Sequence, residues 1–234
     1  MTTVISHLSA LRAIRRARRA YSALPWGVID DEQQAQALAD CVPNKDAIDF
    51  AALAILDAWS EDDPERLDLF VAGGNNRRPD ERLLQHTITA PLPESAIMHI
   101  EADIYATSPA MTAMLCSKNE SVAKTLMLLM ELLGTYSLPP EATYPLAYDD
   151  TWPKADGFEV MGDLDCQGSQ PAPEGQAETR YEQAHYKCEP ATTIEDLEAI
   201  ARFAKSSSYA SFRTAVKLVR AGSASPAESL MFAR

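Results

Sequence analysis

Four arginines near the N-terminus are the residues whose type and spacing most directly suit a binding chemistry. At 100° per residue of a helix they fall within one arc of about 100°, and we call them the Arg stripe: Arg12, Arg15, Arg16 and Arg19. A guanidinium group binds phosphate through a planar fork, so four on one helix face could contact several phosphates. The same stripe could instead pair with acidic side chains of this chain or of a partner protein, or stay solvated on a surface helix.

Two further arginines and a histidine extend this candidate binding set. Arg77 and Arg78 follow a Gly-Gly-Asn-Asn turn, which we expect to be the tip of a hairpin. His86 lies in the strand predicted next, where it could act as a general base or simply pack on its neighbours. The predicted nucleic-acid or partner contacts are therefore Arg12, Arg15, Arg16, Arg19, Arg77, Arg78 and His86.

Familiar catalytic motifs are absent from the sequence. It contains no Walker loop, no G-x-G-x-x-G and no H-E-x-x-H. Ser121 and Lys124 match S-x-x-K, but the companion K-T-G and S-D-N motifs are missing, so we interpret them as two polar residues one helical turn apart. None of the lysines has an acidic residue two positions before it, which excludes the usual PD-(D/E)-x-K nuclease motif. We predict no catalytic residue and no cofactor.

Metal ligands are sparse and poorly spaced. Cys166, His185 and Cys188 offer three donors in a loop-rich stretch, whereas zinc usually takes four with closely spaced pairs. Asp163 and Asp165 beside glycines are typical of a solvated turn. We predict no metal site. An enzyme with an atypical site is the alternative, and it would use His86, Asp163, Asp165 or His185.

The predicted elements indicate an α+β fold with a small, mostly antiparallel sheet. Four regions follow along the chain: an N-terminal helical region at 1–62, strands and helices at 63–136, a Pro-rich and aromatic loop segment at 137–190, and C-terminal helices at 191–234. Helices are expected over 4–21, 30–40, 46–59, 109–117, 119–133, 192–204 and 207–221, with another starting at Ser225. Strands are expected over 67–71, 84–89, 96–100 and 104–107.

Composition and charge restrict the partner and the compartment. The 234 residues are 46% hydrophobic and carry a net charge of −13, which repels phosphate and favours a protein partner with a basic surface over a broad nucleic-acid interface. The longest apolar run, within 125–134, is too short to span a bilayer. Cys41, Cys116, Cys166 and Cys188 show no paired spacing, so we expect free thiols in the cytoplasm.

Residues 65–118 resemble the C-terminal module of AbiEi-type antitoxins. The features that match are the strand 67–71, the Arg77-Arg78 turn, His86, and the run 104–112 (Ile-Tyr-Ala-Thr-Ser-Pro-Ala-Met-Thr) that leads into a helix. Ala106 and Met111 replace the usual valine and arginine of this family. Such antitoxins usually carry a winged helix before this module, but no clear helix-turn-helix is identified in residues 1–60.

A second resemblance covers more of the chain. Residues 5–11, 131–136 and 222–228 resemble the N-terminal region of actinobacterial proteins in which a very-short-patch-repair-like endonuclease domain often follows. Together the two resemblances imply a link to phage defence or toxin–antitoxin systems. We therefore expect a non-catalytic, antitoxin-like recognition or regulatory module that binds a toxin-like protein or a nucleic acid. The alternatives are a repressor that binds DNA through the Arg stripe and the atypical enzyme.

Overall fold

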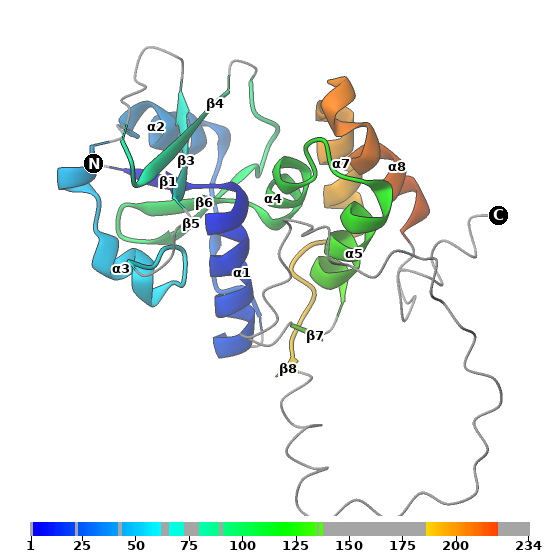
Figure 1. Ribbon diagram of the computed structural model, residues 1–234, viewed down its shortest axis with the longest axis horizontal. Coiled ribbons are helices and arrows are strands. Elements are labelled where there is room, and N and C mark those ends of the chain that lie inside the picture. The colour runs from blue at the N-terminus through cyan, green and yellow to red at the C-terminus, as the bar shows by residue number, and fades with distance from the viewer. Residues whose placement is uncertain are drawn as a thin grey trace, which may run out of the picture. The chain divides into compact units, whose positions relative to one another are not determined.

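A computed structural model describes residues 2–21, 23–41, 44–61, 66–72, 80–88, 91–134, 136–137 and 186–219 (Figure 1). The chain divides into two units, Met1–Ser137 with Lys187–Arg234, and Leu138–Tyr186. The fold below is that of the first unit. The helix expected from Ser225 and most of the expected loop segment lie outside the described residues.

A six-stranded mixed sheet is the centre of this unit, and with the helices it confirms the predicted α+β fold. The strand order is β2-β5-β6-β1-β3-β4, with β6 and β1 in parallel contact at the middle. Three of the five strand pairs are antiparallel, and the β1–β6 and β3–β4 pairs are parallel. The strands are β1 (Thr3–Ile5), β2 (Gly27–Val28), β3 (Leu67–Ala72), β4 (Leu83–Ile88), β5 (Ile97–Glu101) and β6 (Ile104–Thr107).

The β3–β4 pair corrects one expectation. The two strands are parallel, with Phe70 aligned with His86, so they are not the two arms of a β-hairpin. Arg77 and Arg78 were expected at the tip of such a hairpin. Both arginines lie outside the described residues.

The N-terminal region contributes strands as well as helices. β1 and β2 are three and two residues long, too short for an alternating pattern to be visible in the sequence. The helix expected over 4–21 begins only at His7, because residues 3–5 pair with both β6 and β3. The expected helix over 46–59 is shortened to a single 3₁₀ turn at Lys45–Ala47 and the helix α3 at Phe50–Ile55.

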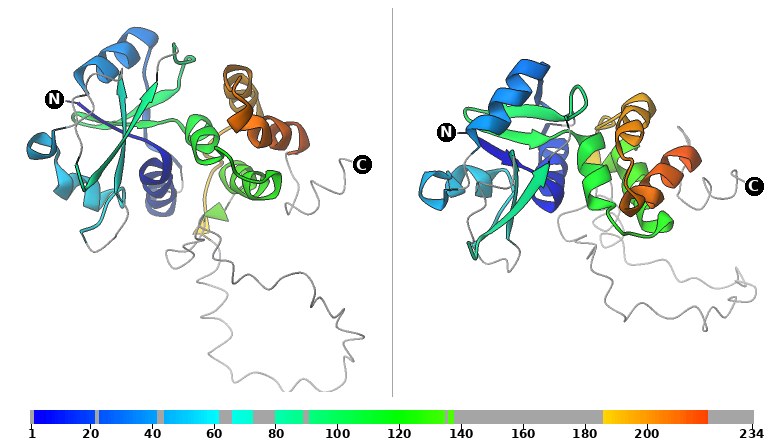
Figure 2. Two further views of the ribbon diagram at one scale, coloured as in Figure 1. Left: turned by 45° about the horizontal axis from the view of Figure 1, so that its top comes forward. Right: turned by 90° about the horizontal axis from the view of Figure 1, so that it is seen from above.

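Seven α-helices are described, and four of them gather at one end of the sheet (Figure 2). These four are α4, α5, α7 and α8, which contact one another, while α1 packs on α4 and on β3. Among the described residues, every helix is too short or too polar to cross a bilayer. The helices are α1 (His7–Tyr21), α2 (Asp31–Asp40), α3 (Phe50–Ile55), α4 (Pro109–Cys116), α5 (Val122–Leu133), α7 (Ile194–Phe203) and α8 (Ala210–Leu218).

Helix starts follow local capping chemistry. Ser108 accepts a hydrogen bond from the N–H of Met111 and precedes Pro109 at the first turn of α4, as the sequence predicts. The capping box of α7 uses Thr193 and Asp196, so this helix begins at Ile194 within the expected range 192–204. Two short 3₁₀ helices, η1 (Lys45–Ala47) and η4 (Ser207–Tyr209), and a two-stranded sheet of β7 (Tyr136–Ser137) and β8 (Tyr186–Lys187) complete the described elements.

A fully buried arginine joins α1 to the end of α5. Arg18 has no solvent exposure, and its guanidinium group donates to the carbonyl oxygens of Glu131, Gly134 and Glu189 at 2.7–3.2 Å. Carbonyls in the last turn of a helix have no partner within the helix, and the negative end of the helix dipole favours a cation there. Arg18 therefore caps α5 with a charged donor, and at the Glu131 carbonyl it adds to the 3.3 Å hydrogen bond from the Gly134 N–H.

Replacing Arg18 with alanine should destabilise the protein by about 3 kcal/mol, because three carbonyl oxygens lose a charged donor inside the protein. Urea denaturation followed by far-UV circular dichroism measures this loss. Arg16→Ala is the matched control, since Arg16 is an exposed residue of the same helix. A free energy of unfolding equal to that of the control would contradict the capping role.

Candidate functional site

The candidate site begins with a carboxylate fixed at the start of α1. Asp68 lies in β3 and its side chain is only 8% exposed. Its Oδ2 atom accepts a hydrogen bond from the Leu8 N–H at 3.2 Å, and its own N–H donates to Ser9 Oγ at 3.0 Å. These contacts fix the orientation of Asp68 beside the first turn of α1.

His86 is bonded to the other oxygen of this carboxylate. Its Nε2 atom lies 2.6 Å from Asp68 Oδ1. In the parallel β3–β4 pair, Asp68 aligns with Leu84 and Phe70 aligns with His86, so the four side chains share one face of the sheet. The parallel pairing therefore brings an acid and an imidazole that are 18 residues apart in sequence into direct contact.

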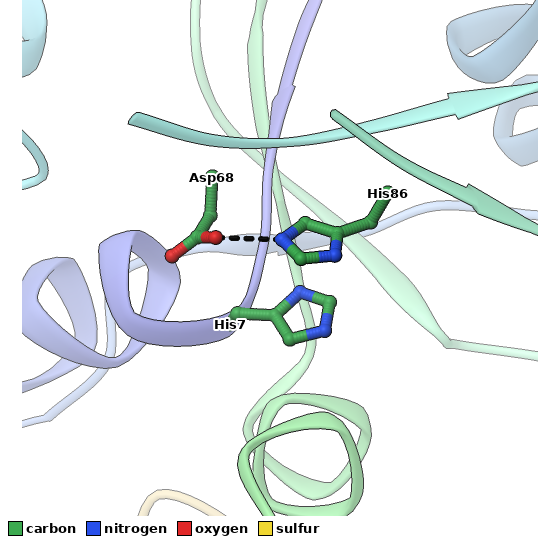
Figure 3. A group of neighbouring side chains, drawn as sticks. All are labelled: His7, Asp68 and His86. Carbon is green, nitrogen blue, oxygen red and sulfur yellow. Dashed lines mark hydrogen bonds and ion pairs between the residues drawn. The ribbon is translucent and has the colours of Figure 1, made fainter. Parts of the chain in front are cut away.

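His7 stacks on His86, with ring centroids 3.6 Å apart and planes inclined by 22° (Figure 3). It is the first residue of α1 and has a φ of 46°, a left-handed conformation that costs a histidine energy and is concentrated at functional sites. Its Nδ1 atom lies 3.0 Å from Ser6 Oγ. Burial, and after it the neighbouring His86, lowers the pKa of His7 to about 3, so its ring is neutral at physiological pH.

A cleft of about 650 Å³ opens over the two histidine rings. Part of its wall is apolar and includes Phe70, Met114 and Phe203. Two exposed lysines, Lys118 and Lys205, also line the cleft, as do Ser206 and Tyr209. This combination of an apolar wall with a few converging polar groups is typical of a small-molecule binding site.

The two lysines that line the cleft come from separate segments of the chain. Lys118 is in the turn between α4 and α5, and the next residue, Asn119, donates its N–H to the carbonyl of Ser208 at 2.9 Å. Arg213 of α8 donates to the carbonyl oxygens on either side of Lys205, those of Ala204 and Ser206. Within the described parts of the chain, neither lysine forms an ion pair.

The structure places much of the Arg stripe against the chain's own acids. Arg15 forms two 2.7 Å bonds with the buried Glu131, and Arg19 lies 3.5 Å from Asp57. Arg16 is exposed, and Arg12 is half-buried. Of the four guanidinium groups, that of Arg16 is therefore the best placed to contact a partner. The helix periodicity alone had indicated that all four could do so.

The other sequence candidates either serve local structure or lie outside the described residues. Ser121 is the N-cap of α5 and accepts from the Lys124 N–H at 3.3 Å, while Lys124 Nζ pairs with Glu120. This supports the structural interpretation of the S-x-x-K match. Asp163, Asp165, Cys166 and His185 belong to the part of the chain that is not described.

Two residues of the site, His7 and Asp68, were missed by the sequence analysis. Neither residue was among the predicted contacts, although Asp68 lies within the strand expected over 67–71. Asp68 and Phe70 are 5% and 2% exposed, so both faces of β3 are buried, since α1 and α2 both contact it. A charged residue inside such an apolar run was the available signal.

The low pKa of His7 makes stability depend on pH. Because an unfolded histidine has a pKa near 6.5, the unfolded chain binds the proton first, and stability falls as the pH drops from 6.5 toward 3. At pH 5.5 the expected loss from His7 is on the order of 1 kcal/mol. Urea denaturation at pH 7.5 and 5.5 gives the change in the free energy of unfolding between the two pH values. This change should be smaller for His7→Asn, which tolerates the positive φ, than for the native protein. Equal changes in the two proteins would refute this assignment.

Comparison with known proteins adds no relative. No family model matches the chain, and neither the curated proteins nor the solved structures contain a significant match. The likenesses of residues 65–118 to antitoxin modules and of the longer sequence to nuclease-associated proteins therefore remain predictions from the sequence motifs. What can be said of function depends on the geometry around His7, Asp68 and His86, and on the cleft beside them.

Proposed function

We propose that this chain is a non-catalytic recognition module, antitoxin-like as its sequence motifs predict, and that its cleft binds a small organic anion. The single observation that supports this is the meeting of Lys118 and Lys205 around a partly apolar cleft in a chain of net charge −13. Two cations converging on one cavity in such an acidic protein are more informative than the same cations spread over its surface.

The size and lining of the cleft favour a particular kind of ligand. A volume of about 650 Å³ falls within the range of pockets that enclose small molecules. Phe203 and Met114 offer contact to a flat or apolar body, and the two lysines and Ser206 offer donors to a charged end. A ring-bearing phosphate or carboxylate compound matches both parts, and a nucleotide is the simplest example.

Screening separates a small anion from a long nucleic acid. At physiological ionic strength the Debye length is about 8 Å, so a small ligand in the cleft is affected mainly by the lysines next to it. A duplex would extend over many ångströms of strongly acidic surface, and the Arg stripe has two of its four members paired with Glu131 and Asp57. The geometry therefore favours the cleft over the stripe as the binding surface.

Titration of the purified protein with adenosine monophosphate in 0.15 M NaCl should give binding detectable by calorimetry. Lys118→Ala and Lys205→Ala should each weaken it about tenfold, since each removes one charge-assisted hydrogen bond. Lys45→Ala is the matched control, because Lys45 is an exposed lysine of η1 that does not line the cleft.

The same experiment tests the repressor alternative. A 20-base-pair duplex should not bind at this salt concentration. If instead the duplex binds, the nucleotide does not, and Arg16→Glu abolishes the complex, then the Arg stripe is the functional surface and the cleft assignment is wrong.

A further inference from the structure

Three potential metal ligands from separate elements meet in one cluster, and two of them line the cleft. His7 comes from the β1–α1 junction, Asp68 from β3 and His86 from β4 (Figure 3). One nitrogen or oxygen atom of each lies within 4.8 Å of those of the other two. Two imidazoles and one carboxylate are a donor set used for divalent transition metals that keep open coordination positions.

We propose that His7, Asp68 and His86 form a binding site for a divalent transition-metal ion such as Zn²⁺. The site goes beyond the proposed recognition of an anion and does not depend on it. Three protein ligands leave at least one position of the metal free, as in sites that bind a ligand or a water molecule rather than purely structural ones. Since His7 and His86 line the cleft, that free position faces it.

The existing contacts bring the donors close to the separation that a metal needs. Bonds of 2.0–2.2 Å at a tetrahedral angle place two ligand atoms about 3.3 Å apart. The 2.6 Å contact between Asp68 Oδ1 and His86 Nε2 must therefore lengthen by less than 1 Å as the metal replaces the shared proton. Asp68 stays oriented meanwhile, because the Leu8 N–H holds its other oxygen.

The ring of His7 makes the larger adjustment. In a stack the lone pairs of two rings run nearly parallel, whereas a shared metal requires them to converge. Rotation about the second side-chain torsion of a histidine is soft, and its present hydrogen-bond partner for Nδ1 is the neighbouring Ser6 hydroxyl. Turning the ring therefore breaks one stacking contact and one hydrogen bond, and a bond to the metal forms in their place.

Lys118 gives the proposal an electrostatic signature. Its charge acts on His7, so it disfavours a cation bound at the three ligands while favouring an anion in the cleft. Lys118→Ala should strengthen metal binding severalfold and weaken nucleotide binding. The two proposals can therefore be tested separately. If one of the two ligands does not bind, the effect of Lys118→Ala on the binding of the other can still be measured.

Titration of the untagged protein with Co²⁺, followed by visible absorption, should show one equivalent bound with bands typical of nitrogen and oxygen ligation, and Zn²⁺ should displace it. His7→Asn, His86→Gln and Asp68→Asn should each weaken binding at least tenfold. His99→Gln is the matched control, because His99 lies in β5 and bonds to the Ala102 carbonyl instead of to this cluster.

If a substitution unfolds the protein, a measurement on the native chain still tests the proposal. Zn²⁺ should protect His7 and His86 of the native chain from diethyl pyrocarbonate, as mapped by mass spectrometry, and leave the labelling of His99 unchanged. Absence of Co²⁺ binding at 1 mM, binding weakened equally by His99→Gln, or protection of His99 alone would each overturn the proposal.

Discussion

The guanidinium groups of Arg15 and Arg18 hold α1 against the C-terminal end of α5, and the arrangement of the unit depends on this contact. Arg18 is fully buried on the carbonyl oxygens of Glu131, Gly134 and Glu189, and Arg15 is paired with the buried Glu131 carboxylate. A buried cation without these acceptors would cost several kcal/mol. The contact therefore fixes the position of α1 relative to α5, and with it the start of α1 where His7 lies.

The same contact explains why a basic helix occurs in an acidic protein. Arg15, Arg18 and Arg19 neutralise or cap groups of this chain, so most of the positive charge of α1 serves the fold. Periodicity placed Arg15 and Arg19 on one face correctly but could not reveal which acid would meet them. It also gave no reason to expect Arg18 in the interior, since arginines are rarely buried without a network of acceptors.

Elements with local signals were predictable from the sequence, and elements made by distant pairing were not. β6 and the start of α4 follow from the run Ile104–Thr107 and the Ser108-Pro109 cap, which act within a few residues. β1 is only three residues long and is stabilised by β3 and β6, some 65 and 100 residues away. The parallel direction of the β3–β4 pair was likewise not predictable, because the two strand sequences alone suit either direction.

The candidate site depends on pairing between strands that are distant in the sequence and on the local backbone conformation at His7. Asp68 and His86 meet only because β4 lies parallel to β3, and His7 joins them only because β1 places the start of α1 over that face. His7 accepts a left-handed backbone at this point, although an asparagine or glycine would adopt it at lower cost. A fold that needed only a helix start here would gain stability from such a replacement. The strained backbone and the buried acid beside it are therefore better explained by what the three side chains can bind together than by the stability of the fold.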